Sequence, residues 1–506
     1  MVSFARGRWS AALCIAGAFG ILSSCKDSQA SEWQLRFQDA LVGQRARYVE
    51  ARILLGGCQG SELVYRSEFA IDAAGSVPPA LPAGRYGFAA RARDEDCQWI
   101  AEGCVELDVP AERRTEIVLA TLPAQDACGS VSCTSPRCAA SSPAGLDCST
   151  RPVQGPVVEV ATGEEHSCAR LESGWVYCWG RNSEGQLGVD TGGAAASGAL
   201  QVPGLCDASR LELGHHYSCA LRSDGQVWCW GDNSKGQLGR MTNAPAPNAL
   251  PAAVSGLGRV LTLGAGADHA CAVKEDGSIA CWGDNTRGQL GVAGSFGPTP
   301  VVVPGIQAAQ EVAAGGLHSC ARLLEQSYCW GNNDDGQLGS GAAGGGAEPR
   351  PIASSVVFAS IEAGEAHSCG IDAGGRAYCW GKGDQNRLGV GSTESRALPT
   401  ALAGEIRFRS IAPGDVSTCA LSTASELYCW GNNGQGQLGF GDLTSRPTPT
   451  RVGGLSLLTS VDVALRHACA AGPGGTYCWG RNGKGETGRG GTSAYETRPA
   501  QVVGLP

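Results

Sequence analysis

Short runs that alternate apolar and polar residues, with turn residues between them, dominate the chain from about residue 30 onward. The run Val-Glu-Leu-Asp-Val at 105–109 has the period-two pattern of a half-buried strand. Glycine pairs such as Gly56-Gly57 separate one run from the next. The pattern predicts strands at residues 33–37, 50–55, 63–71, 86–93 and 104–109. Strands of this length and spacing predict a small β-sandwich over residues 25–122.

One long uncharged run comes before these strands, from Trp9 to Ser24, and it follows Arg6 and Arg8. Sixteen residues are too few for a membrane-spanning helix, which needs about 20, but they suit a signal peptide. The run ends in Leu-Ser-Ser-Cys at 22–25, which resembles a bacterial lipobox. The resemblance implies a signal peptide over residues 1–24, lipidation of Cys25, and an exported lipoprotein anchored at the outer membrane or cell surface. The alternative is an ordinary signal peptide with a chance cysteine.

A different pattern recurs seven times over residues 157–506, and its first copy begins with His166-Ser167-Cys168. Each copy continues with an aromatic residue, Cys-Trp-Gly, and then a sequence close to Gly-Gln-Leu-Gly. The Cys-Trp-Gly cysteines have a mean spacing of 50 residues. A period of this size indicates a solenoid or a propeller, and the many glycines argue against helical repeats. The sequence therefore predicts an all-β chain with a seven-bladed β-propeller after the small sandwich.

The seven units resemble the repeat of the regulator of chromosome condensation (RCC1) family, whose members form seven-bladed propellers and commonly bind proteins. The second unit carries nearly the whole motif: Gly214, His216, Ser218, Asp224-Gly225, Trp230-Gly231 and Gly236-Gln237-Leu238-Gly239. Four places depart from the motif: Ala280, Asn386-Arg387-Leu388-Gly389, Ser417 and Gly485-Glu486-Thr487-Gly488. The last departure predicts the seam where the ring closes. In the first part, Leu81–Tyr86 resembles the strand-entry motif of transthyretin-like sandwiches.

Each repeat holds two cysteines, 9 or 10 positions apart. In the second repeat they flank Ser223-Asp224-Gly225, and a three-residue hairpin loop with glycine last places Cys219 opposite Cys229. Directly opposed residues lie within the range of a disulfide. The predicted bridges are Cys168–Cys178, Cys219–Cys229, Cys271–Cys281, Cys320–Cys329, Cys369–Cys379, Cys419–Cys429 and Cys469–Cys478.

Metal binding is the alternative for these cysteines, since His269, Cys271 and Cys281 share a strand face and offer three zinc ligands. Export to an oxidising compartment favours disulfides, so no metal is predicted. Residues 123–156 hold Cys128, Cys133, Cys138 and Cys148 among small residues, which indicates a disulfide-pinned linker. The pairing of these four with Cys58, Cys97, Cys104 and Cys206 stays open, although Cys206 lies in the propeller and is a candidate to hold the linker.

Composition narrows the functional classes. The 506 residues carry a net charge of −9, which disfavours binding to a phosphate backbone. Glycine accounts for 75 residues, about twice average usage, and only 17% of residues are charged. The 24 cysteines are too many for an ordinary cytosolic protein and point to an oxidising compartment.

Candidate chemistry in the repeats has structural explanations. Adjacent strand residues point to opposite faces, so His-Ser pairs such as His318-Ser319 are predicted to pack blades and not to act as base and nucleophile. The runs Asp232–Gly236 and Asn332–Gly336 lack the spacing of a calcium loop and indicate turns.

The sequence therefore predicts a non-catalytic scaffold without cofactor that binds a protein or an envelope glycan and no nucleic acid. Its partner is expected at variable loops such as 189–199 and 240–251. Two alternatives are an extracellular hydrolase acting on polysaccharide or peptide and, from the family resemblance alone, a guanine-nucleotide exchange factor.

Overall fold

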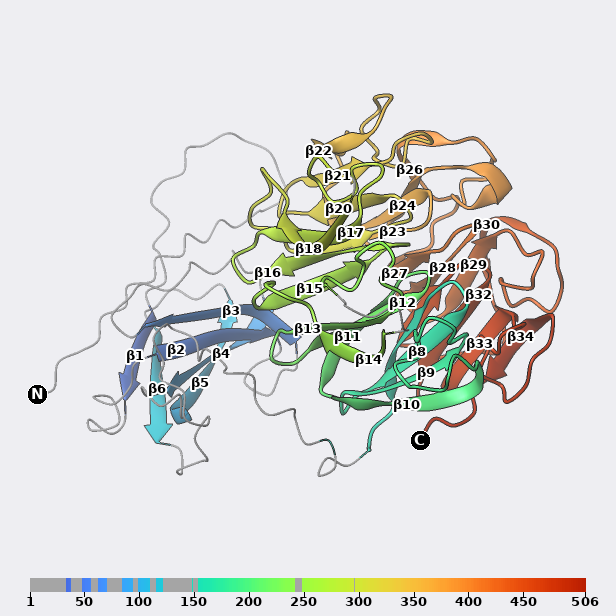
Figure 1. Cartoon of the computed structure of the whole chain (residues 1–506). Coiled ribbons are helices and arrows are strands. Elements are labelled where there is room, and N and C mark those ends of the chain that lie inside the picture. The colour runs from blue at the N-terminus through green and yellow to red at the C-terminus, as the bar shows by residue number, and fades with distance from the viewer. Residues whose placement is uncertain are drawn as a thin grey trace, which may run out of the picture. The chain divides into compact units, whose positions relative to one another are not determined.

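The computed structural model describes six strands between residues 33 and 121, Cys148, and residues 153–241, 248–294 and 296–506. It divides the chain into two units, residues 1–145 and 146–506, and each is described by itself (Figure 1). Cys25, the predicted leader and most of the predicted linker lie outside the described residues. Within the described residues no helix is long and apolar enough to cross a bilayer.

The first unit contains one hydrogen-bonded sheet with the strand order β1-β6-β5-β4-β2-β3. Its strands are β1 (Trp33–Phe37), β2 (Tyr48–Leu55), β3 (Glu62–Ala70), β4 (Gly84–Arg93), β5 (Trp99–Val109) and β6 (Thr115–Thr121). Five of these strands were predicted; β6 was missed. β6 pairs in parallel with β1 and joins β5 through only two residue pairs. The two-layer sandwich stays a prediction, because apart from Ala90 the side chains here lie outside the described residues.

The second unit is the predicted seven-bladed propeller, and each blade is a four-stranded antiparallel sheet (Figure 1). Blades 1 to 3 contain β7 (Val157–Thr162), β8 (His166–Leu171), β9 (Trp175–Gly180), β10 (Ala196–Cys206); β11 (Ala208–Leu213), β12 (Tyr217–Arg222), β13 (Val227–Gly231), β14 (Asn248–Ala253); and β15 (Val260–Ala265), β16 (His269–Lys274), β17 (Ile279–Asp284), β18 (Phe296–Val302).

Blades 4 to 7 repeat the same arrangement. They contain β19 (Glu311–Ala314), β20 (His318–Arg322), β21 (Ser327–Gly331), β22 (Gly346–Pro351); β23 (Phe358–Ala363), β24 (His367–Asp372), β25 (Ala377–Gly381), the 3-10 turn η2 (Asp384–Asn386), β26 (Arg396–Ala401); β27 (Phe408–Pro413), β28 (Ser417–Ser422), β29 (Leu427–Gly431), β30 (Arg446–Arg451); and β31 (Ser460–Val463), β32 (His467–Gly472), β33 (Gly475–Arg481), β34 (Tyr495–Gln501).

The first strand of each blade is innermost and contacts the first strand of the next blade around a central channel. The fourth strand is the outer edge, where unpaired backbone groups invite pairing with another chain. Every outer strand contains proline, for example Pro251 in β14 and Pro399 in β26. Proline lacks an N–H donor, so these edges are poor templates for further strands.

The second and third strands of each blade form the hairpin that carries the cysteines. In each blade the two cysteines lie directly opposite each other, with Cα atoms 4.0–4.1 Å apart. The structure joins all seven pairs expected from the sequence and also joins Cys148 to Cys206. Gly225, the third loop residue of blade 2, has a φ of +86°, which is the left-handed conformation that the loop requires.

A tryptophan on the third strand fills each interface between blades. All seven are less than 2% exposed: Trp179, Trp230, Trp282, Trp330, Trp380, Trp430 and Trp479. Each indole Nε1–H donates to a main-chain carbonyl of the preceding blade at 2.8–3.0 Å, as Trp330 does to the oxygen of Gln289. Since the acceptor is backbone, Arg387 and Glu486 can replace the usual glutamine without loss of the bond.

A ring of six glycines lies where neighbouring inner strands end. A Cβ added at any of them would lie 2.1–2.5 Å from a carbonyl oxygen of the next blade: Gly163, Gly214, Gly266, Gly315, Gly364 and Gly414. Glycine is therefore required here for close approach of two backbones. Blade 7 has Ala464 at this position, facing blade 1.

The seam between blades 7 and 1 is closed without exchange of a strand among the described residues. β31 and β32 contact β7, and the Asp462 carboxylate accepts hydrogen bonds from the Thr162 backbone N–H at 2.7 Å and hydroxyl at 2.9 Å. Trp179 donates to the carbonyl of Glu486, so the variant segment 485–488 does lie at the seam.

One loop expected to vary freely is part of this seam. Residues 194–199 contain the beginning of β10, and the Ala199 N–H donates to the carbonyl of Val503 in blade 7 at 2.9 Å. The Ser197 carbonyl also accepts from Gly490 at 2.7 Å. The last four residues of the variable loop 189–199 are therefore the start of an outer strand, and backbone hydrogen bonds hold them to blade 7.

We predict that Gly266→Ala destabilises the propeller. The new Cβ would lie 2.1 Å from the Gly315 carbonyl oxygen, so overpacking should lower the free energy of unfolding by about 1–3 kcal/mol. Urea unfolding followed by tryptophan fluorescence measures the change. Gly453→Ala is the control, because no atom lies within 4 Å of its Cβ position. Equal stability of the two variants would contradict the close-approach explanation.

Candidate functional site

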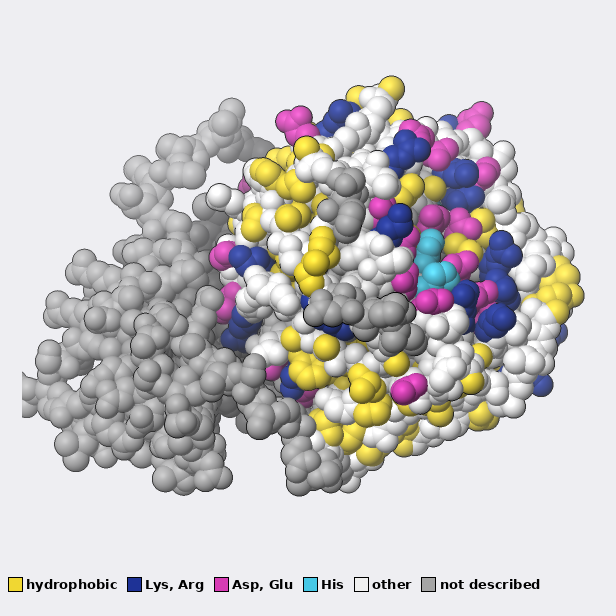
Figure 2. Space-filling view, in the orientation of Figure 1, with side chains coloured by type: hydrophobic (Ala, Val, Ile, Leu, Met, Phe, Trp, Pro, Cys, Tyr) yellow, Lys and Arg dark blue, Asp and Glu magenta, His cyan; other side chains and the backbone are white. Residues whose placement is uncertain are grey.

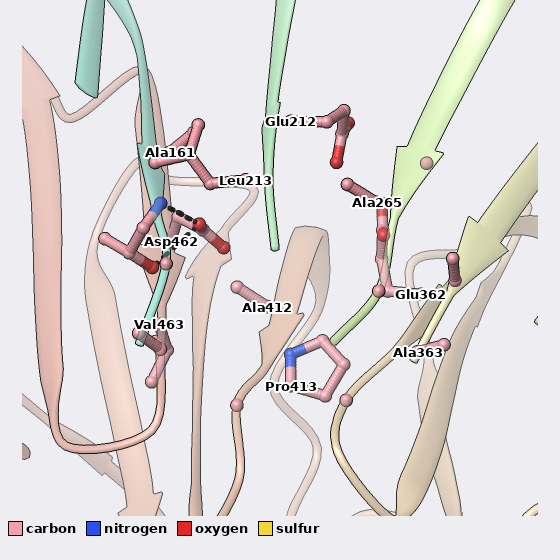
Figure 3. A pocket seen from close by; sticks show the side chains of 18 of the residues that line it. Ala161, Glu212, Leu213, Ala265, Glu362, Ala363, Ala412, Pro413, Asp462 and Val463 are labelled. Atoms are coloured by element: carbon pink, nitrogen blue, oxygen red, sulfur yellow. Dashed lines mark hydrogen bonds between the residues drawn. The ribbon is translucent and has the colours of Figure 1, made fainter. Parts of the chain in front are cut away.

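The central channel holds a cavity of about 270 Å³, lined by the inner strands of all seven blades (Figure 3). At the level opposite the first cysteine of each hairpin, the inner strands carry Glu212, Glu362 and Asp462. The other four residues of that level are small: Ala161, Gly264, Ala313 and Ala412. The small size of these four residues leaves room for the cavity, and the three carboxylates lie around it.

These carboxylates have perturbed acidities. Desolvation raises the pKa of Glu212 to about 7, against the opposing effect of Arg210, whose Nε lies 2.6 Å from a Glu212 oxygen. Desolvation also raises the pKa of Glu362 and of Asp462. The channel therefore carries less negative charge below neutral pH than its composition suggests.

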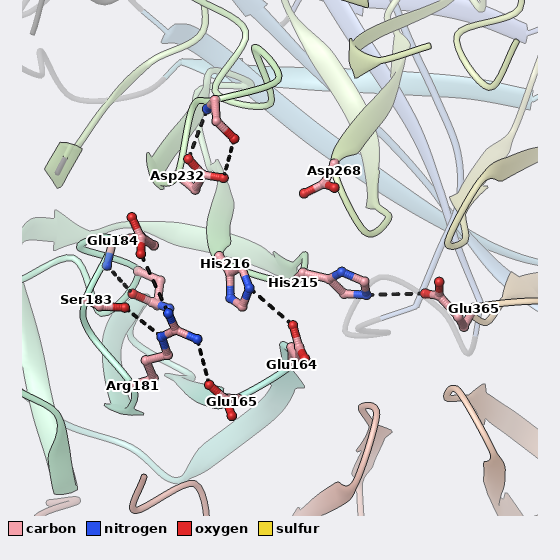
Figure 4. A network of polar contacts seen from close by, with 12 residues as sticks. Glu164, Glu165, Arg181, Ser183, Glu184, His215, His216, Asp232, Asp268 and Glu365 are labelled. Carbon is pink, nitrogen blue, oxygen red and sulfur yellow. Dashed lines mark hydrogen bonds and ion pairs between the residues drawn. The ribbon is translucent and has the colours of Figure 1, made fainter. Parts of the chain in front are cut away.

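One end of the channel lies at the turns between first and second strands, on the same face as the loops between third and fourth strands, and we call this the mouth face. Figure 2 shows histidine, acidic and basic side chains together on this surface. His215 of blade 2 reaches Glu365 of blade 5, with Nε2 and Oε2 3.2 Å apart (Figure 4). Its neighbour His216 pairs at 3.2 Å with Glu164 of blade 1. The first contact crosses the channel opening; the second joins adjacent blades.

A second polar cluster on this face lies at the seam. Arg181 of blade 1 and Arg481 of blade 7 contact the two carboxylate oxygens of Glu165 at 2.8 and 2.6 Å. Although burial opposes it, the hydrogen bond from Arg181 and the charge of Arg481 lower the pKa of Glu165. Arg481 also approaches the buried Glu486 at 3.5 Å. This cluster reinforces the interface between blades 7 and 1, where Ala464 takes the place of the glycine.

The repeated histidines pack blades, as predicted, and each bonds to a hydroxyl in the next blade. His318 Nε2 lies 2.8 Å from Ser368 Oγ, and Ser368 donates its hydrogen to the Gln337 carbonyl at 3.0 Å. Because the serine hydrogen is used there, His318 must donate from Nε2, which leaves an unprotonated Nδ1. The same contact joins His166 to Ser218, His269 to Ser319, His367 to Thr418 and His467 to Ser167.

Two blades lack this histidine, and the next blade then lacks the hydroxyl. Tyr217 replaces it in blade 2 and Ala270 follows in blade 3; Ser417 replaces it in blade 6 and Ala468 follows in blade 7. Assigning His216 to the repeat histidine was therefore wrong by one residue. The register places Tyr217 opposite Gly231, where the other blades have histidine, and this frees His216 for the mouth.

The side chains considered as zinc or calcium ligands are bonded to other groups of the protein. Cys271 and Cys281 are bridged and His269 bonds to Ser319. No group of three or more His, Cys, Asp or Glu side chains in the described part of the chain is arranged to hold a metal. In the run 232–236, the Asp232 carboxylate accepts from the backbone and hydroxyl of Ser234, which is turn chemistry.

Comparison with known proteins agrees with the repeat geometry. The profile of the RCC1-like domain matches residues 124–406 and 212–506, well over half of the chain. The chain belongs to the RCC1-like family. Among relatives, the mitochondrial RCC1 domain-containing protein RUG3 of Arabidopsis thaliana is 32% identical over 173 residues, covering 32% of this chain and 39% of RUG3. The probable human E3 ubiquitin ligase HERC6 is 37% identical over 139 residues, covering 27% of this chain and 14% of HERC6.

These matches span less than two-fifths of either relative. Among solved structures, human WBSCR16 has a TM-score of 0.58 at 22% identity, covering 63% of this chain and 88% of that one. Yeast RCC1 (Prp20), solved bound to Kap60, also has 0.58 at 22% identity, covering 64% and 83%. At such identity these structures show the shared fold of this RCC1-like chain.

We predict that five of the seven histidines do not titrate near neutral pH: His166, His269, His318, His367 and His467. Burial lowers the pKa of His269 to about 3 and of His318 and His467 to about 4, and burial lowers those of His166 and His367 further from their ordinary value. In the unfolded chain these five histidines take up protons near pH 6.5, whereas in the folded chain they stay neutral. The free energy of unfolding therefore falls as pH falls below 6.5.

Histidine-selective NMR from pH 5.5 to 8 measures this. Five Cε1–Hε1 resonances should stay constant, with nitrogen shifts typical of the Nε2–H tautomer. A titration step in any of the five would contradict the proposed burial of these histidines and their hydrogen bonds to the hydroxyls.

Proposed function

We propose that this propeller is a non-catalytic scaffold that binds a protein partner through its mouth face. The observation that carries the proposal is the contrast between the two faces. On the face opposite the mouth, the connections between second and third strands are two to four residues long in every blade, and those from one blade to the next are one to eight residues long. The mouth face has the longer third-to-fourth strand connections, differing charges, and the histidine pairs found only in blade 2. Specificity in repeat proteins resides where repeats differ.

Relatives of the same fold give this proposal its precedent. One structure of yeast Prp20 contains Kap60, and another is described together with its binding to Gsp1p and histones. Those partners belong to Prp20. For the present chain we carry over only the class of function, binding of a protein, with an envelope glycan as the second candidate ligand.

The hydrolase alternative has little support in the channel. Glu212 and Glu362 are carboxylates with raised pKa, but the His215–Glu365 contact crosses the opening above them. Nucleotide exchange rests on analogy of fold alone, which does not transfer function.

We predict that reversing charge on the mouth face weakens partner capture. Arg287 is 53% exposed on this face and Arg407, on the opposite face, is 45% exposed; each lies beside one carboxylate. In cells, photo-crosslinking followed by mass spectrometry should find a saturable partner for the native protein. Arg287→Glu should reduce its capture several-fold, whereas Arg407→Glu should leave it within twofold. Loss with Arg407→Glu alone would place binding on the opposite face and contradict the proposal.

We also propose that the protein is exported and anchored through a lipidated Cys25, on the strength of the leader pattern and the many disulfides. Two or three acyl chains hold a protein firmly at a bilayer. Cys25→Ala should therefore move the protein from the membrane to the soluble fraction. Retention of the variant in detergent-free membranes would contradict lipidation at this residue.

A further inference from the structure

We propose that His215 and Glu365 form a pH-controlled latch over the channel mouth, closed while the histidine is protonated and released when it loses its proton. The proposal concerns the opening of the channel and does not depend on which face binds a partner. It rests on the position of this contact, which joins blades 2 and 5, two blades that are not neighbours in the ring.

The latch differs from the backbone contacts around the mouth. Neighbouring blades are joined there by backbone bonds, such as His215 N–H to the Ala267 carbonyl at 3.0 Å and Glu365 N–H to the Gly414 carbonyl at 3.1 Å. These bonds fix both backbones. The His215–Glu365 contact is made by side chains alone, so it can open by rotation without disturbing the blades. Figure 4 shows the imidazole and the carboxylate pointing toward each other.

The surroundings favour a charged histidine. The titratable groups that face the latch are Glu164 from blade 1, His216 from blade 2, Asp268 from blade 3, Glu365 from blade 5 and Asp415 from blade 6. Although burial opposes protonation, the hydrogen bond and charge of Glu365, with the charges of Glu164 and Asp268, raise the pKa of His215 above 6.5. The latch is thus strongest in acid and weakens as pH rises through that raised value.

Release of the latch follows from the charges that remain after His215 loses its proton. Glu365 then faces the other carboxylates of the mouth without a cation beside it. The two latch side chains are 29% and 32% exposed, so water can replace their contact at low cost. Below the latch, burial raises the pKa of Glu212 to about 7, so Glu212 ionises as pH rises through that value and adds negative charge to the channel. Repulsion therefore grows on both sides of the latch as the ion pair disappears.

Histidine-selective NMR of the full chain from pH 5 to 9 tests the charge coupling. His215 should titrate with a midpoint above 6.5, and Glu365→Gln should lower that midpoint. His216→Gln is the matched control, because His216 is 27% exposed and pairs with a carboxylate but does not cross the channel. It should move the His215 midpoint less than Glu365→Gln does. A midpoint at or below 6.5, or one that Glu365→Gln does not move, would overturn the proposal.

Crystal structures at pH 5.5 and pH 8.5 test opening itself. The distance from His215 Nε2 to Glu365 Oε2 should stay near 3.2 Å in acid and exceed hydrogen-bonding distance at pH 8.5. A double-mutant cycle with His215→Gln and Glu365→Gln should show a coupling in thermal stability that is several-fold larger at pH 5.5 than at pH 8.5. An unchanged distance or an equal coupling at the two pH values would show that the contact is a fixed brace and not a latch.

Discussion

One main-chain carbonyl in each blade, at the position of the glutamine in Gly-Gln-Leu-Gly, holds the ring together. It accepts the indole N–H of the next blade in all seven interfaces and a serine or threonine hydroxyl in five. That hydroxyl in turn accepts the N–H of a histidine from the blade that supplies the carbonyl. One acceptor thus positions the buried tryptophan, the hydrogen-bonded polar groups and the next blade. Because the acceptor is a main-chain carbonyl, the bond does not depend on the side chain of that residue.

The glycine ring converts this packing into a narrow channel. Because backbones approach within contact distance at positions such as Gly214 and Gly364, the inner strands converge, and side chains one residue further on can meet across the axis. Three acids in place of small residues then give the cavity its charge. The mouth is therefore a consequence of ring closure, and its chemistry comes from the few residues that blade packing does not use.

Much of the fold could be predicted from local patterns, because the cysteine spacing and the glycine of each hairpin are short-range features. Cys219 opposite Cys229 needs only hairpin register. The contacts between blades could not be predicted in the same way. A histidine and its serine are about 50 residues apart, and the one visible clue was that alanine follows in the next blade wherever histidine is absent, as with Tyr217 and Ala270. The assignment of His216 failed because motif spacing does not show which residue points into an interface.

The candidate site is found where the repeat is interrupted, and this has a physical reason. A side chain that recurs in every blade is accounted for by packing that every blade needs. Histidine occurs once at this level, as His215, and acids occur in three blades, whereas two other blades have Ala267 and Gly316 and close their mouth turns with the same backbone bonds. Blade formation therefore does not require the imidazole or the carboxylate. Because carboxylates brought together at a channel mouth repel one another, a titratable partner among them makes the local conformation depend on pH, whatever ligand this face binds.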